Sequence, residues 1–134
     1  MTPGALLIDR CGLSQREAAT FLGVGLDAVK SWSIGRNRMS PAVQETLRDL
    51  YRRIERAAGE TLIMLDAAPG DAEIELGFVA DDAEAQDIGW PCVGAQRAML
   101  GIVLARARRP VRLVPRGSTV ATAGAIAAHQ PPTR

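Results

Sequence analysis

The hydrophobic and polar positions near the start of the chain predict two short helices joined by a tight turn. Ser14, with Glu17 three residues later, forms a capping pair that starts a helix. Gly23 predicts the end of that helix, since glycine accepts the positive φ that such a stop needs. Val29 and Trp32, three positions apart, form the apolar stripe of a second helix. We therefore expect helices over about 14–22 and 26–34.

Two further helices are expected around this pair. Pro3 predicts a helix over 3–11, because proline favours the first helical position. Ser40-Pro41 is a strong helix start, and apolar side chains then recur every three or four positions. These side chains are Val43, Leu47, Leu50, Tyr51, Ile54 and Ala58. The recurrence predicts a long amphipathic helix over 41–58, with Gly59 as its C-terminal cap.

Beyond residue 60 the pattern changes to short pieces around one apolar helix. Residues 60–72 fit either a last turn of helix or an extended piece. Residues 73–79 and 111–114 are expected as strands, and residues 81–87 as a solvated acidic loop. Residues 91–107 predict a helix that is apolar nearly all round. A domain this small cannot cover such a helix alone, so we expect a second copy of the chain against it. The residues expected in this dimer interface are Trp90, Val93, Met99, Leu100 and Val103.

Basic and acidic residues are almost equal in number over the whole chain, but they are distributed unevenly along the sequence. The 134 residues carry 16 Lys/Arg and 15 Asp/Glu, a net charge of +1, so no whole-molecule field favours nucleic acid. Residues 1–60 carry nine basic and seven acidic side chains. Residues 61–90 carry eight acidic side chains and no basic ones, and residues 91–134 carry seven basic side chains and no acidic ones. The N-terminus has no signal-peptide pattern, and no apolar run is long enough to cross a membrane. We therefore expect a cytoplasmic protein without a membrane partner.

The sequence offers no arrangement for catalysis or metal binding. No nucleophile–base pattern is visible, so we expect no enzyme, no metal and no cofactor. The two cysteines, Cys11 and Cys92, lack metal-type spacing and favour a reduced compartment. Cys92 leaves two interpretations open, a redox-sensitive thiol at a helix start or a small buried side chain, and the second is favoured.

Gln15, Ala19, Gly23, Val29 and Trp32 stand at the offsets of a known DNA-binding motif. Their spacing resembles that of the lambda-repressor-like (XRE) domains. The resemblance implies a helix-turn-helix whose second helix enters the major groove of DNA.

The second half of the chain carries a narrower resemblance. A strand, an acidic segment, Ile88-Gly89-Trp90 and a helix bearing Gln96 resemble the C-terminal region of the anti-CRISPR-associated (Aca) repressors. In these regulators a helix-turn-helix precedes a dimerisation domain. The implied fold class is mainly α, a lambda-repressor-like helix-turn-helix bundle followed by a small α+β (strand-helix-strand) dimerisation domain. The expected bounds are 1–59 for DNA binding, 60–116 for dimerisation and 117–134 for a flexible tail.

Helical geometry selects the side chains of the second helix that are expected to meet DNA. Asp27, Lys30, Ser31 and Ile34 are expected to point outward, away from the apolar stripe. Leu26, at the leading end, suits a thymine methyl group, and Lys30 suits a guanine edge or a phosphate. Asp27 fits either the amino group of cytosine or a favourable charge at the helix N-terminus.

Outside this helix the expected contacts are with the DNA backbone. The resemblance assigns Gln15, at the start of the preceding helix, to a phosphate. Arg36 and Arg38 lie in the following loop, where backbone contacts are common in such domains. Ser40 is expected to cap its helix first and to touch phosphate second.

These expectations define a dimeric transcriptional repressor on an inverted-repeat (palindromic) operator of double-stranded DNA, regulating its own, anti-CRISPR-type operon. A monomer makes too few phosphate contacts for specific binding, so a homodimer supplies both affinity and operator symmetry. The alternative is an antitoxin whose C-terminal half binds a toxin. Toxin-binding segments are usually disordered alone, whereas residues 88–114 predict a folded element, which favours repression.

Overall fold

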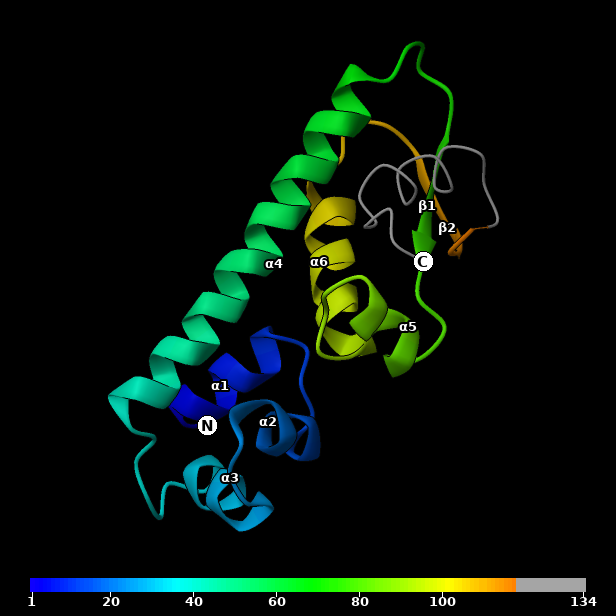
Figure 1. The fold of residues 1–134 in the computed structure, drawn as a ribbon. Coiled ribbons are helices and arrows are strands. Elements are labelled where there is room, and N and C mark those ends of the chain that lie inside the picture. The colour runs from blue at the N-terminus through cyan, green and yellow to red at the C-terminus, as the bar shows by residue number, and fades with distance from the viewer. Residues whose placement is uncertain (118–134) are drawn as a thin grey trace.

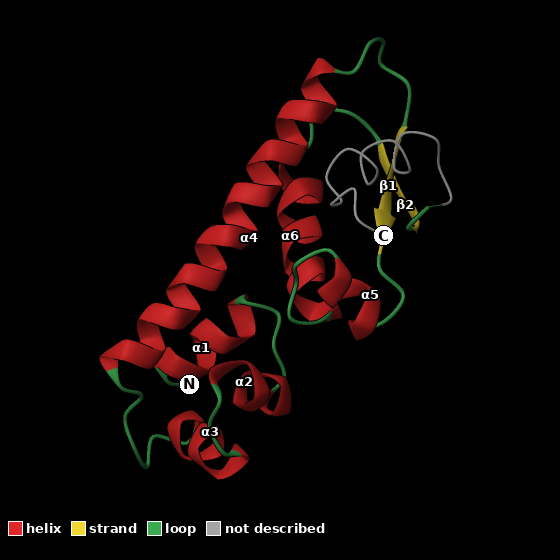
Figure 2. Cartoon of the chain, viewed as in Figure 1, coloured by secondary structure: helices red, strands yellow, loops and turns green. Residues whose placement is uncertain are grey.

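The computed structural model describes residues 1–117, a mainly helical chain with one small sheet (Figures 1 and 2). Its elements, in chain order, are α1 (Pro3–Arg10), α2 (Gln15–Leu22), α3 (Leu26–Ser33), α4 (Pro41–Ala67), β1 (Ile74–Phe78), α5 (Asp82–Asp87), α6 (Val93–Arg106) and β2 (Val111–Pro115). The expected helices over 3–11, 14–22 and 26–34 and both expected strands are confirmed to within about a residue. The predicted tail lies almost wholly outside the described residues.

The long helix α4 forms the backbone of the molecule. Figure 1 shows α1, α2 and α3 gathered around its N-terminal end, with α6 beside its middle and α5 and the sheet beyond α6. The fully buried side chains of α4 include Leu47, Leu50 and Ile54, and they belong to one hydrophobic cluster with residues of α1, α3 and α6. The two halves of the chain therefore share a core.

The predicted end of this helix at Gly59 is wrong. α4 continues without a break to Ala67, so the boundary expected between residues 59 and 60 falls inside a helix. A glycine inside a helix costs about 1 kcal/mol relative to alanine. Burial of Leu65, which is 3% exposed, and the good helix formers around it offset that cost.

The C-terminal end of α4 is held by a distant arginine. Arg109 donates from Nη1 to the carbonyl oxygens of Leu65 (3.1 Å) and Ala68 (2.9 Å), and from Nη2 to that of Ala72 (2.8 Å). A cation at a helix C-terminus also interacts favourably with the helix dipole. The local sequence of residues 60–68 contains no sign of this partner.

The acidic segment is a helix and not the solvated loop that was predicted. Asp81 caps α5 by accepting the Glu84 N–H at 2.9 Å, and Ala85 is fully buried. Asp82 accepts the Val93 N–H at 2.9 Å and so caps the start of α6. Carboxylates are stabilising at helix N-termini, which explains the acidic run as capping chemistry.

The dimer-interface residues predicted on and before α6 require a correction. Trp90, Met99, Leu100 and Val103 are 8%, 9%, 4% and 0% exposed in the single chain, and Val93 is partly buried. α6 packs along α4, which the sequence pattern did not pair with it. The guanidinium of Arg53 on α4 also lies over the Trp90 ring, 5.6 Å from its centroid. These side chains are core residues, so no second copy is needed to cover them.

The sheet consists of β1 and β2, paired in parallel with Ile74 opposite Val111. One edge of β1 is closed by a side chain of α6, because Gln96 accepts the Val79 N–H at 2.9 Å and donates to the Gly77 carbonyl at 3.4 Å. Gln96 is 4% exposed, so its amide replaces a neighbouring strand inside the protein.

Candidate nucleic-acid interface

Capping groups at its two ends fix the start of α2 and its turn into α3. The Ser14 hydroxyl accepts the Glu17 N–H (3.1 Å), and a Glu17 carboxylate oxygen accepts the Ser14 N–H (2.9 Å). Gly23 ends α2 with φ of 69°, and its N–H donates to the carbonyl oxygens of Ala19 and Thr20, the latter at 3.3 Å. The predicted start at Ser14 and the predicted stop at Gly23 are both confirmed, and α3 begins three residues after Gly23.

The orientation of α3 follows from two residues on its inner side. Val29 is fully buried, and Trp32 is half-buried against the core. Thr2 donates to the Trp32 carbonyl at 2.9 Å, which ties the start of α1 to the end of α3. This packing leaves the opposite side of α3 open to solvent.

Three side chains form that open side, and we call them the α3 ridge: Asp27, Lys30 and Ile34. All three are exposed, and they follow one another at three- and four-residue steps, which places them on one helix face. Leu26, predicted beside them, is partly buried and packs on the core. The ridge therefore presents an anion, a cation and an apolar group side by side.

Ser31 does not belong to this surface, which corrects its predicted outward position. It is 8% exposed, donates to the Ala28 carbonyl at 2.8 Å and accepts the Asn37 side-chain amide at 3.3 Å. Its carbonyl accepts the backbone N–H groups of Arg36 (2.9 Å) and Asn37 (3.3 Å). The loop after α3 folds back over Ser31, an event that helical geometry alone does not reveal.

This loop carries the two predicted arginines to the end of the ridge. Arg36 and Arg38 are exposed, while Met39 beside them is 6% exposed and anchors the loop. Ser40 accepts the Val43 N–H at 3.2 Å, so its predicted capping role is confirmed. The arginines thus extend from a fixed backbone.

The cations of this surface are not neutralised by neighbours. Among the described residues, none of Lys30, Arg36 and Arg38 forms an ion pair, whereas Arg48 and Arg52 on α4 pair with acidic side chains of their own helix. Arg16, exposed beside the predicted Gln15 at the start of α2, likewise forms no ion pair within residues 1–117. Sequence reasoning passed over Arg16, although its place in the first turn of α2 was visible.

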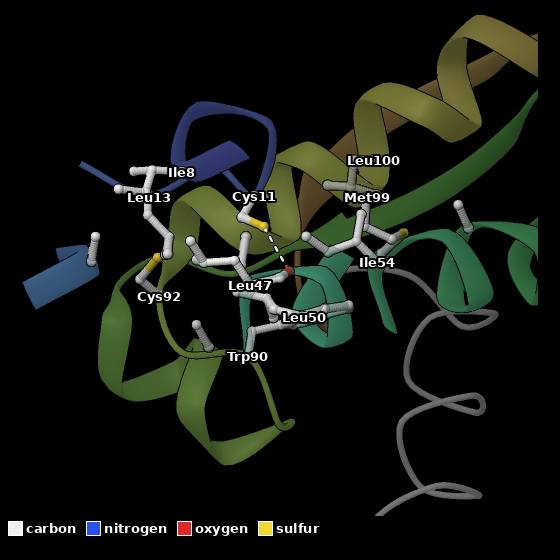
Figure 3. Close-up of a cluster of buried hydrophobic side chains, with 14 of the residues drawn as sticks. Ile8, Cys11, Leu13, Leu47, Leu50, Ile54, Trp90, Cys92, Met99 and Leu100 are labelled. Carbon is white, nitrogen blue, oxygen red and sulfur yellow. Dashed lines mark hydrogen bonds between the residues drawn. The ribbon is translucent and has the colours of Figure 1, made fainter. Parts of the chain in front are cut away.

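The thiols are placed for packing. Burial raises the pKa of Cys11 to about 11, and its Sγ donates to the Leu47 carbonyl at 3.4 Å (Figure 3). Burial also raises the pKa of Cys92, which is 2% exposed. A raised pKa disfavours the reactive thiolate, so the interpretation of Cys92 as a small buried side chain is preferred to a redox-sensitive one. In residues 1–117 no group of three His, Cys, Asp or Glu side chains is arranged to hold a metal ion.

Comparison with protein-family models and with curated proteins finds no match to this chain. Within the described part, no helix combines the length and the apolar character that crossing a bilayer requires.

Proposed function

We propose that this protein is a helix-turn-helix transcriptional repressor that binds double-stranded DNA in a sequence-specific manner. The observation that carries the proposal is the α3 ridge, an exposed helix face bordered by Arg36 and Arg38, two cations that form no ion pair in the described part of the chain. Major-groove recognition needs such a face, because base edges offer donors, acceptors and the thymine methyl group within reach of one helix.

Each part of the surface has a separate task in this proposal. α3 enters the major groove, where Lys30 donates to guanine O6 and N7 and Asp27 accepts from cytosine N4. The N-terminal end of α2 meets the phosphate backbone through its free N–H groups and through Gln15 and Arg16. Arg36 and Arg38 bind phosphates and fix the register of the domain without reading sequence.

The proposed repressor acts as a homodimer on an inverted repeat and regulates its own, anti-CRISPR-type operon. The interface must lie outside the buried residues first expected there. The large apolar side chains that α4, α6 and β2 leave exposed are Ile63 (70%), Met64 (51%), Leu104 (44%) and Leu113 (39%). Self-association through part of this set would remove apolar surface from water and pair two α3 ridges.

Selection of binding sites from a random double-stranded DNA pool tests the proposal. We expect a selected sequence with two-fold symmetry, bound by the full chain in a gel shift. Arg36→Ala should weaken binding in the gel shift. Arg56→Ala, which removes an exposed arginine of α4 outside the proposed DNA-binding surface, should leave binding unchanged. Recovery of no sequence above the starting pool would contradict the proposed function.

A further inference from the structure

Ile34 is an isoleucine that the fold leaves in water. It is 68% exposed at the end of α3, whereas Val29 and Trp32 of the same helix pack inward. Burying an aliphatic side chain is favourable, so an exposed one on a ridge of charged groups contributes little to folding. Its surface is available to a ligand that approaches α3 from solvent.

Ile34 is the last residue of the ridge, and its backbone is well fixed. It follows Lys30 by four residues, so the two side chains are neighbours on the helix surface. Its N–H bonds the Lys30 carbonyl at 3.2 Å, and the next two residues are held by bonds to Trp32 (3.3 Å) and Ser31 (2.9 Å). A β-branched side chain on a held backbone keeps few rotamers and loses little entropy on contact.

We propose that Ile34 is a base-reading residue that contacts the C5-methyl group of a thymine in the major groove. This inference rests on the proposed function. The thymine methyl is the apolar group that base edges present in that groove, and it matches an aliphatic side chain. Leu26, first expected in this role, is partly buried against the core and has less free surface.

The proposal fixes where the thymine should lie. Four residues of α-helix separate Ile34 from Lys30, about 6 Å along the axis at the usual rise per residue. Base pairs are stacked about 3.4 Å apart, so the thymine lies roughly one or two base steps from the base pair that Lys30 contacts. It recurs in both halves of a two-fold symmetric site.

Replacing each thymine of the selected site by uracil tests the contact, because uracil lacks only the methyl group. For the wild-type chain, one replacement in each half-site should weaken binding about fifteenfold, because about fourfold is expected for each of the two apolar carbons removed. Ile34→Ala should bind thymine and uracil at that position equally. Ile34→Val should retain most of the preference, and Leu6→Ala, which truncates another exposed aliphatic side chain on α1, should retain all of it.

The outcomes separate the two proposals. Suppose that the wild-type chain binds its selected site and that Ile34→Ala lowers the affinity for thymine and uracil sites by the same factor. The variant then keeps the wild-type preference for thymine at every position, and Ile34 reads no methyl group. That result overturns this inference and leaves the proposed function standing. If the wild-type chain selects no DNA, both fall.

Discussion

The carbonyl oxygen of Gly12 and the α-carbon of Gly94 lie in direct backbone contact. A β-carbon built on Gly94 would sit 1.8 Å from the Gly12 oxygen, and one built on Gly12 would sit 2.0 Å from the Gly94 oxygen. Gly12 also has φ of 77°, which favours glycine. Gly12 follows α1, and Gly94 lies in the first turn of α6. This contact joins the proposed DNA-binding part to the second half of the chain.

The first prediction concerns this contact. Gly94→Ala should lower the free energy of unfolding by about 2 kcal/mol or more, since backbone atoms must separate to admit the methyl group. Gly101→Ala is the control on the same helix, because nothing lies within 4 Å of its added β-carbon. That variant should gain about 0.5–1 kcal/mol from helix propensity. Urea unfolding measures both, and equal stability of the two variants would contradict the close contact.

The second prediction separates base reading from backbone binding. Lys30→Ala should cost about 1–3 kcal/mol at the selected site and relax base preference there. Arg36→Ala and Arg38→Ala should weaken all sequences alike, and each should lower the salt slope of binding by about 1 per subunit of the dimer. Gel shifts at several salt concentrations, on selected and scrambled DNA, measure both effects. If Lys30→Ala kept its base preference, the orientation of α3 in the groove would have to be revised.

The third prediction follows from the buried thiol of Cys11, whose pKa of about 11 lies above its usual value of 9.0. Above pH 9 the unfolded chain loses this proton while the folded chain keeps it, so stability falls as pH rises from about 9 to 11. Below pH 9 both states hold the proton and the thiol causes no pH dependence. The loss should reach about 2 kcal/mol near pH 11.

Cys11→Ala isolates this effect from other groups that titrate at high pH. The variant should be less stable than wild type at pH 7, since it leaves a small cavity, but it should lose less stability between pH 9 and 11. Urea unfolding across this pH range measures the difference. A parallel decline in the two proteins would mean that Cys11 ionises normally in the fold.

Sequence reasoning succeeded where the structure depends on neighbouring residues. The cap at Ser14, the stop at Gly23 and the inward Val29 are local, and α2, its turn and α3 follow from them. It failed where a distant group decides the outcome. The continuation of α4 past Gly59 involves Arg109, which lies 44 residues after the Leu65 whose carbonyl it holds. The burial of Leu100 involves a helix that the pattern had not paired with it.

The residues of the candidate site likewise differ in whether the sequence could predict their exposure. Exposure of Lys30, Arg36 and Arg38 was predictable from helix geometry and loop polarity, and the structure agrees. The burial of Ser31 was not predictable, because the loop that covers it takes its path from hydrogen bonds formed only in the folded chain.

The last prediction tests the long-range support of α4. Arg109→Leu removes three hydrogen bonds from a charged donor to the carbonyls at and beyond the helix end. We expect the free energy of unfolding to fall by about 2–3 kcal/mol, because each of these carbonyls loses a hydrogen bond from a charged donor. Arg108→Leu is the matched control, since this neighbouring arginine is exposed and has no polar partner among the described residues. Amide hydrogen exchange should show faster exchange over residues 62–68 in Arg109→Leu alone, with the α2–α3 segment unchanged. If both leucine variants exchanged alike in this segment, Arg109 would not be what holds α4 beyond Gly59, and the favourable packing of Leu65 would have to suffice.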